Sequence, residues 1–166
     1  MLSKWDRKFF NLIKEYKQLS KDPSSQFAAI IVSDDNIPKS FGFNGFARGV
    51  IDSPERYNNR ELKYKMVVHA EANAIVNAAG EGTPTKGCKI YIDTYPCSSC
   101  CGLIINAKIK EIVINGDSSV HNDKTFQERW KESIEITKLM CEEAGVKIRI
   151  FNEEHLDDFK NHGNGD

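Results

Sequence analysis

Residues 89–115, KIYIDTYPCSSCCGLIINAKIKEIVIN, decide the fold because they contain a strand, a helix and a second strand with short connections. Residues 89–94 have the pattern of a strand, and Pro96 ends it before a helix that we predict over residues 97–107. Residues 111–115, EIVIN, are rich in β-branched side chains and are typical of a strand. Strands joined by one helix in this way favour a parallel sheet with the helix packed on it.

The alternation of strands and helices continues on both sides of this unit. Hydrophobic periodicity predicts a helix over residues 5–19, strands over 27–32 and 40–44, a helix over 70–79, a helix over 126–145 and a strand over 146–151. The strands at 27–32 and 40–44 are close enough in sequence to form a hairpin. The complete order, α-β-β-α-β-α-β-α-β, favours an α/β fold with a largely parallel sheet covered by helices on both faces.

Three segments carry more specific expectations. The first helix has an apolar stripe, made by Trp5, Phe9, Leu12, Ile13, Tyr16 and Leu19. Residues 27–32 form a continuous apolar run, which is typical of a strand buried on both faces. Residues 45–65 are polar and contain glycines, a proline and the run YNNR, so we predict a long loop there. Loops of that length in a compact domain are usually functional or mobile.

The composition indicates one globular domain. The 166 residues are 40% hydrophobic, which is enough to form a core. The formal net charge is −1 and opposite charges are interleaved, so an extended track for a long nucleic acid is not expected. Five cysteines, an odd number, favour reduced thiols and metal binding over disulfides. Since no stretch resembles an export signal or a membrane span, we expect a cytoplasmic protein, or one in the host cytoplasm if it is viral.

Two short motifs carry the chemistry. His69 is followed two residues later by Glu71, and Pro96 precedes a pair of cysteines, Cys97 and Cys100. One imidazole and two thiolates suit Zn²⁺, and three protein ligands leave a coordination position open for water. A carboxylate close to that water can move protons between it and a substrate. The combined pattern H-x-E…P-C-x-x-C is typical of zinc-dependent hydrolytic removal of an amine from a nucleobase.

Both motifs are predicted at the start of a helix. His69 and Glu71 would share one face only where the helix begins, with the histidine near the cap and the carboxylate in the first turn. Cys97 and Cys100 likewise lie where the helix dipole and free amides favour thiolate over thiol. We therefore expect the amino-terminal ends of two helices to converge on one metal ion.

A structural zinc site is the alternative, and it would need a fourth protein ligand. The candidates for this ligand are Cys101, Cys88, Cys141 and His121. Cys101 follows a proposed ligand directly, and adjacent helical residues point in different directions, so we expect it to pack in the core. A structural site would also leave the nearby Glu71 without a role.

The chain resembles the deoxycytidylate (dCMP) deaminases, within the zinc cytidine-deaminase superfamily. The segments that carry the resemblance are SKDPS at residues 20–24, GFNGFARG at 42–49, KY at 63–64, VHAEANAI at 68–75, YPCSSC at 95–100 and DSSVH at 117–121. The resemblance implies a three-layer α/β/α fold with a five-stranded mixed sheet and helices on both faces. It also implies a deaminase domain over residues 1–151, followed by a polar carboxy-terminal tail over residues 152–166.

By that resemblance, the protein is a hydrolase that converts dCMP into dUMP and ammonia for thymidylate synthesis. His69, Cys97 and Cys100 would hold zinc, and Glu71 would be the catalytic proton carrier. The substrate would contact four further residues: Asn44 at the deoxyribose hydroxyl, Ala70 through its backbone near the base amine, and Arg48 and His121 at the 5′-phosphate.

Relatives of this kind are commonly homohexamers that are activated by dCTP with Mg²⁺ and inhibited by dTTP. The resemblance places the allosteric nucleotide at residues 45–65. Two departures concern this segment, because Ala47 stands where a proline is usual and VIDS at residues 50–53 replaces a Cys-Ser-Asp-Asp-like stretch. Some relatives bind a second zinc in the same segment. Residues 45–68 contain no cysteine or histidine here, so we expect one zinc per chain.

Three other functions compete with this interpretation. A deaminase of tRNA or single-stranded DNA would need a basic groove and aromatic stacking platforms, and the weakly acidic composition argues against it. A deaminase of another cytosine nucleotide or of free cytidine would differ in its need for the 5′-phosphate. A non-catalytic nucleotide-binding protein with a structural zinc would bind dTTP without releasing dUMP.

Overall fold

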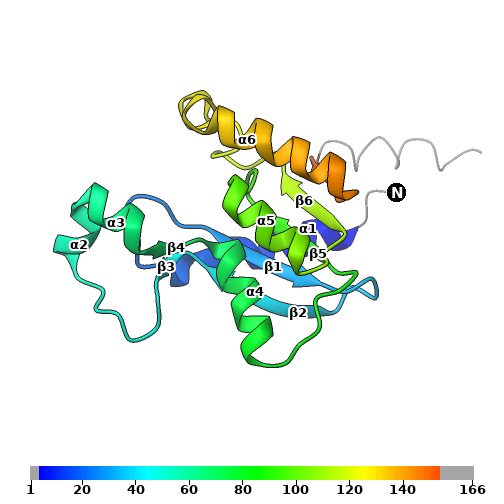
Figure 1. The fold of residues 1–166 in the computed structure, drawn as a ribbon, viewed down its shortest axis with the longest axis horizontal. Helices are drawn as coiled ribbons and strands as arrows, with labels where there is room; N and C mark the ends of the chain where they lie inside the picture. The colour runs from blue at the N-terminus through cyan, green and yellow to red at the C-terminus, as the bar shows by residue number, and fades with distance from the viewer. Residues whose placement is uncertain (1–3, 154–166) are drawn as a thin grey trace, which may run out of the picture.

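A five-stranded sheet forms the centre of the molecule (Figure 1). The computed structural model describes residues 4–153. The strands follow the order β2-β1-β5-β6-β7, with bounds β1 Ala28–Val32, β2 Pro38–Phe43, β5 Lys89–Ile92, β6 Glu111–Asn115 and β7 Lys147–Phe151. β1 pairs antiparallel with β2 and β5, whereas β5, β6 and β7 pair in parallel. The mixed sheet and the hairpin are therefore confirmed.

The expectation of a largely parallel sheet is wrong for two of the four strand pairs. Between β2 and β5 the chain forms several short elements and then the helix α4 (Ala70–Gly80), which packs on the sheet, and β2 and β5 run in the same direction, as the alternation predicts. They are not neighbours, however, because β1 lies between them and pairs antiparallel with both. A crossover that spans one intervening strand leaves no local signal in the sequence.

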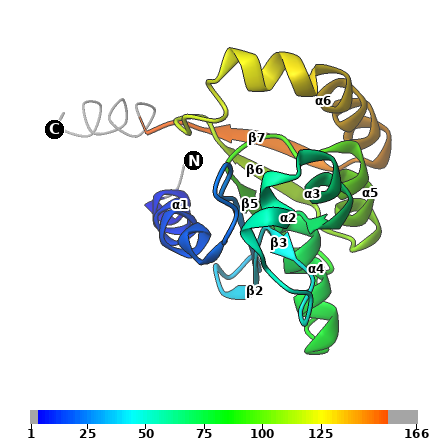
Figure 2. The same cartoon turned by 90° about the vertical axis from the view of Figure 1, so that its left-hand side faces the viewer.

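Helices cover both faces of the sheet (Figure 2). α1 (Lys4–Tyr16) packs on one face and continues into a short 3₁₀ turn, Lys17–Leu19. α4 (Ala70–Gly80), α5 (Ser98–Asn106) and α6 (Lys124–Ala144) lie on the other. Alternate residues of β1 enter the two cores: Ile30 faces α1 and Ile31 faces the other three helices. Every residue of β1 is buried, which confirms the strand buried on both faces.

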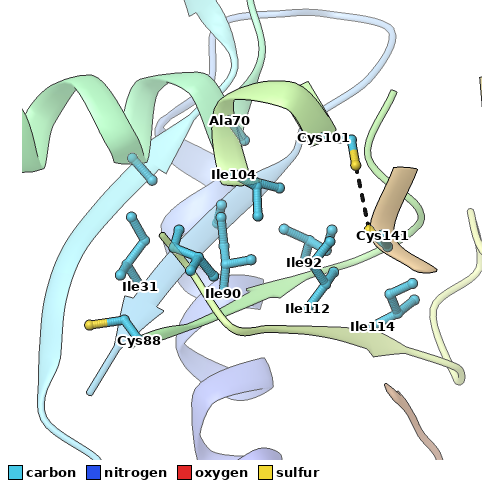
Figure 3. Close-up of a cluster of buried hydrophobic side chains, with 13 residues drawn as sticks. Ile31, Ala70, Cys88, Ile90, Ile92, Cys101, Ile104, Ile112, Ile114 and Cys141 are labelled. Atoms are coloured by element: carbon cyan, nitrogen blue, oxygen red, sulfur yellow. Dashed lines mark hydrogen bonds between the residues drawn. The ribbon is translucent and has the colours of Figure 1, made fainter. Parts of the chain in front are cut away.

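The larger core fills the space between the sheet and α4, α5 and α6 (Figure 3). Ile90 and Ile92 of β5 and Ile112 and Ile114 of β6 point into it and are almost completely buried. This close packing fixes the helices relative to the ends of the strands. The positions of the α4 and α5 amino termini therefore depend on the sheet.

The apolar stripe of α1 differs from the predicted one. Phe9, Phe10 and Ile13 are buried against β1, Tyr91 and Phe151, whereas Leu12 and Leu19 are 45% and 54% exposed. The helix ends at Tyr16, so Leu19 no longer follows its periodicity. Phe10, outside the predicted stripe, takes a place in the core through ring contacts with Tyr91 and Phe151.

The prediction of one long loop over residues 45–65 is wrong. The segment contains a short strand, β3 (Gly45–Phe46), paired with β4 (Val67–Val68), and two short helices, α2 (Pro54–Asn58) and α3 (Arg60–Met66). Side-chain caps stabilise both helices: Ser53 accepts a hydrogen bond from the Arg56 amide, and Asn59 accepts one from the Leu62 amide. The Ser53-Pro54 pair was a helix-start signal that the polar composition obscured.

α6 ends where the sequence predicts. Asp123 caps its first turn by accepting hydrogen bonds from the Thr125 and Phe126 amides, and Gly145 terminates it with a positive φ of 70°.

Nowhere in residues 4–153 is a helix both long enough and apolar enough to span a bilayer. The predicted tail, residues 152–166, lies outside the described residues except for its first two positions.

Gly42 in β2 allows α4 to approach the sheet closely. A Cβ atom at this position would overlap the Ala70 carbonyl oxygen and the Ala74 backbone nitrogen, both of which belong to α4. These are backbone atoms of a helix and cannot move aside alone. Glycine at residue 42 thus helps to place the first turn of α4.

Gly42→Ala is expected to destabilise the fold by about 2 kcal/mol or more, because the helix must shift to admit the methyl group. Urea unfolding of the purified protein measures this change. Gly102→Ala is the control, since a Cβ there meets only Met140 Cε at 3.7 Å and alanine favours a helix. Equal stabilities of the Gly42→Ala variant and the unchanged protein would contradict the packing argument.

Candidate metal centre and adjoining cavity

The amino termini of α4 and α5 converge on one point. His69 is the N-cap residue of α4, Cys97 is the N-cap residue of α5, and Cys100 lies in the first turn of α5. The His69 Nδ1 atom lies 3.5 Å from Cys97 Sγ and 3.6 Å from Cys100 Sγ. The structure thus brings together the three residues that the sequence predicts as metal ligands.

The spacing of these donor atoms fits Zn²⁺. In a tetrahedral site with the usual Zn–S and Zn–N distances, nitrogen and sulfur ligands are separated by roughly 3.5 Å. The three ligand atoms here all lie within 4.8 Å of one another. Within residues 4–153, no other group of three or more histidine, cysteine or acidic side chains is arranged in this way. One imidazole and two thiols are also the donor set that zinc favours.

The pKa values of the two thiols are shifted in opposite directions. Hydrogen bonds from the Cys100 side chain, the His69 imidazole and the Cys100 amide lower the pKa of Cys97, against the effect of burial. The pKa of Cys100 is raised, first by its interaction with Cys97 and then by burial. Hydrogen bonds to the Cys97 sulfur thus favour its thiolate, which is the form that binds a metal.

Glu71 lies in the first turn of α4 and lines the cavity beside the metal ligands. Burial raises the pKa of its carboxyl group, and the opposing charge of His69 only partly offsets this effect. A raised pKa makes the carboxylate a stronger proton acceptor, which suits a group that takes up a proton and passes it on. Its position and environment suit the proton carrier that the sequence predicts.

The candidate fourth ligands lie elsewhere. Cys101 Sγ contacts Cys141 Sγ at 3.5 Å inside the larger core, and Figure 3 shows both with Cys88 among the core side chains. His121 stacks on Tyr95 with ring centroids 5.9 Å apart. None of these residues joins the metal-ligand group. Within the described residues, the protein offers three ligands at this point, which fits a site with an open position.

A cavity of about 510 Å³ opens beside the three ligands. Its apolar wall comes from α6, where Phe126, Trp130 and Ile134 follow one another at helical spacing. The Trp130 ring meets the His69 ring edge-on, with centroids 6.4 Å apart. The sequence indicated that these α6 residues share one helix face, but it did not reveal that this face covers the candidate site.

The predicted substrate contacts are only partly brought together. Asn44 and Ala70 line the cavity, whereas Arg48 and His121 are not among its lining residues. The Arg48 guanidinium donates a hydrogen bond to Asn77 near the far end of α4. The His121 ring packs on Tyr95, and burial lowers the pKa of its imidazole, with the positive charge of Lys138 as a further cause.

Other polar residues of the cavity were not predicted as site residues. Asp22, Lys63 and Arg129 line it, and a smaller cavity of about 360 Å³ adjoins it. The two cavities share Ser24, Ser25, Phe27, Asp93, Phe126 and Arg129. Asp22 and Lys63 belong to SKDPS and KY, two of the segments that carry the family resemblance, so the sequence did draw attention to them. Arg129 lies on the exposed part of a long helix and had no such signal.

Comparisons with known proteins agree with this geometry. The family model described as "cytidine and deoxycytidylate deaminase zinc-binding region" matches residues 3–115. An uncharacterised deaminase from the luxG 3′ region of Aliivibrio fischeri is 36% identical over 89% of this chain and 94% of its own length. Human deoxycytidylate deaminase is 36% identical over 89% of this chain and 79% of its own length.

Solved structures show the same fold. The dCMP deaminase of cyanophage S-TIM5, crystallised with dCMP and dUMP, superposes with a TM-score of 0.67 at 18% sequence identity. The match covers 91% of this chain and 99% of the phage chain. At this low identity the likeness concerns the fold, and it confirms the predicted cytidine-deaminase-like architecture.

Proposed function

The chain belongs to the cytidine and deoxycytidylate deaminase zinc-binding family and is a zinc-dependent deaminase, and on that premise we propose that its substrate is dCMP. The products are dUMP and ammonia, and the dUMP supplies thymidylate synthesis. The observation that carries the proposal is the convergence of His69, Cys97 and Cys100 beside Glu71, in a cavity large enough for a small ligand. The similarity to vertebrate deoxycytidylate deaminases supports the choice of a cytosine nucleotide.

Glu71 performs the proton transfers in this mechanism. His69, Cys97 and Cys100 would hold a zinc ion, and zinc at this point would make a water molecule acidic enough to serve as the nucleophile near neutral pH. Glu71 accepts a proton from that water and delivers it to the ring nitrogen beside the amine-bearing carbon, which becomes more electrophilic. The hydroxide oxygen would then bond to that carbon, and Glu71 would carry the proton of the new hydroxyl group to the amine. The C–N bond breaks, ammonia leaves, and the oxygen remains as the carbonyl of the uracil ring.

The cavity walls orient the base and the sugar. The backbone of Ala70, in the first turn of α4, meets the amine side of the base. Asn44 has one amide N–H left for the deoxyribose hydroxyl, after its side chain accepts from the Phe27 amide and donates to the Ser25 carbonyl. Phe126 and Trp130 cover the base with apolar surface and keep bulk water away.

A further proposal concerns the residues that bind the 5′-phosphate. The resemblance assigns the phosphate to Arg48 and His121, but the exposed guanidinium of Arg129 lines both cavities and is a better-placed candidate. Serine hydroxyls from Ser24 and Ser25 line the same junction. A guanidinium with hydroxyl groups is well suited to a dianionic phosphate.

Arg129→Gln is expected to raise the KM for dCMP by roughly 10- to 100-fold, the effect of losing one charge-assisted hydrogen bond. Its activity on deoxycytidine, which has no phosphate, should stay unchanged. In assays without dCTP or dTTP, the matched variant Arg48→Gln should leave both values near those of the unchanged protein. Steady-state ammonia release decides between them, and the opposite pattern would return the phosphate to Arg48.

A product assay tests the proposed function. The protein is incubated with cytidine, dCMP, dCTP and a cytosine-containing polynucleotide, each with and without dCTP or dTTP as effector, and uracil products are quantified. Deamination of dCMP in preference to the others supports the proposal. Preference for cytidine or for the polynucleotide would assign a different substrate, and dTTP binding without any dUMP would indicate a non-catalytic nucleotide-binding protein.

Regulation and assembly follow the same family pattern in this proposal. The enzyme forms homohexamers in the cytoplasm, or in the host cytoplasm if viral, is activated by dCTP with Mg²⁺ and is inhibited by dTTP. The effector binds at residues 45–65, where Ala47 and residues 50–53 alter the nucleotide preference.

Residues 1–151 form the deaminase domain and residues 152–166 its tail. Each chain binds one zinc, and a metal analysis that finds two would contradict this stoichiometry.

A further inference from the structure

Two ion pairs fasten α2 and α3 to the loop that precedes β1. Lys63 of α3 pairs with Asp22 at 2.8 Å, and Lys21 pairs with Asp52, just before α2, at 3.0 Å. Adjacent residues of opposite charge on the loop thus meet opposite charges on the helical segment. The two pairs hold residues 52–66 against one wall of the cavity.

The Lys63–Asp22 pair is buried. Lys63 is 9% exposed and Asp22 is 2% exposed, and Lys63 is the only lysine or arginine among the buried residues of the described chain. The Lys63 ammonium also contacts the Ser24 hydroxyl. Although burial opposes the shift, hydrogen bonds from Lys63 and Ser24 lower the pKa of Asp22, which favours its carboxylate form. A buried charge of this kind is costly once its partner is removed.

Hydrogen bonds connect this pair to Asn44. The Asp22 carboxylate that receives Lys63 also accepts from the Ser24 amide at 2.9 Å and the Ser25 amide at 3.2 Å. The Ser25 carbonyl accepts from the Asn44 side chain at 2.8 Å. All of these residues line the cavity, and the hydrogen bonds connect Lys63 to Asn44 through Asp22 and Ser25.

We infer that Lys63 is a positioning residue for the deaminase reaction, which sets the cavity wall at residues 22–25 and thereby the orientation of Asn44 towards the substrate. This role rests on the proposed function. It makes the placement of α3 a determinant of substrate affinity, although Lys63 supplies no group to the reacting atoms. A misplaced wall should therefore affect the KM for dCMP more than kcat.

The test compares Lys63→Met with Lys110→Met, both made in the full chain loaded with zinc and assayed without dCTP or dTTP. Lys110 forms an exposed ion pair with Asp34, away from the cavity and from residues 45–65, and serves as the matched control. For Lys63→Met, the KM for dCMP is expected to rise about 10- to 100-fold with a smaller change in kcat and full zinc content. Hydrogen exchange of the backbone amides at residues 22–27 should also become faster. Lys110→Met should change neither the KM nor the exchange rate.

Asp22→Asn provides a second variant if Lys63→Met does not fold. Asparagine still accepts the Ser24 and Ser25 amides but removes the charge that holds Lys63, so the KM should rise by a smaller factor. A folded variant of either kind with a KM within twofold of the unchanged protein would overturn the inference. So would unchanged amide exchange at residues 22–27. If the protein without substitutions does not deaminate dCMP, the proposed function is wrong. The hydrogen-exchange comparison still decides in that case whether Lys63 stabilises residues 22–27.

Discussion

Glu71→Gln is expected to lower kcat for dCMP by about 10²- to 10⁴-fold while the zinc content stays at one per chain. Glutamine has nearly the same shape as glutamate but cannot accept and return a proton at neutral pH. Since Glu71 is not a metal ligand in this arrangement, the three ligands remain intact. The loss should appear in kcat as well as in kcat/KM, because the missing interaction belongs to the chemical step.

The measurement is ammonia release together with metal analysis of the same preparation. Glu81→Gln, at the exposed carboxy-terminal end of the same helix, is the control and should behave like the unchanged protein. A Glu71→Gln variant with a near-normal rate would remove Glu71 from the mechanism. A variant that loses zinc would show instead that the carboxylate holds the metal.

Cys100→Ser is expected to abolish deamination by removing zinc. Changing only the outer partners of metal ligands already costs about 10- to 100-fold in affinity, so losing a ligand itself should cost more. Zinc content after dialysis against a chelator, followed by activity with and without added zinc, measures both effects. Turnover should fall to the level of the chelated protein.

Cys101→Ala is the matched control, because the next residue in the chain is also a buried cysteine. Its sulfur contacts Cys141 and the Thr137 carbonyl in the core rather than the metal ligands. The variant should keep its zinc and most of its activity and lose only a little stability. Loss of zinc from Cys101→Ala, or full zinc binding by Cys100→Ser, would contradict the assignment of ligands.

The strands and main helices could be predicted because their signals are local. The doubly buried run at residues 27–32 and the stop at Gly145 appear in the structure as expected. The helices α2 and α3 were missed, since five- and seven-residue helices have no hydrophobic period and depend on caps such as Ser53 and Asn59. The position of β1 between two parallel strands depends on tertiary pairing, which no local pattern specifies.

The residues of the candidate site also fall into those with a local sequence signal and those placed only by the tertiary fold. His69, Glu71, Cys97 and Cys100 could be identified because the chemistry requires those residue types at short, fixed spacings. The cavity walls could not be identified, because Trp130 lies on a later helix, 30 residues after Cys100 in sequence. The predicted phosphate contacts Arg48 and His121 came from resemblance alone, and the structure places both outside the cavity lining.

The central claim is that the zinc ion has three protein ligands and one position left for solvent. Zinc-edge X-ray absorption of the metal-loaded protein measures this most directly. We predict two sulfur ligands at about 2.3 Å from zinc and two nitrogen or oxygen ligands at about 2.0 Å, one from His69 and one from solvent. A third sulfur, or a crystal structure in which another side chain of this protein permanently fills the fourth position, would contradict the hydrolytic mechanism.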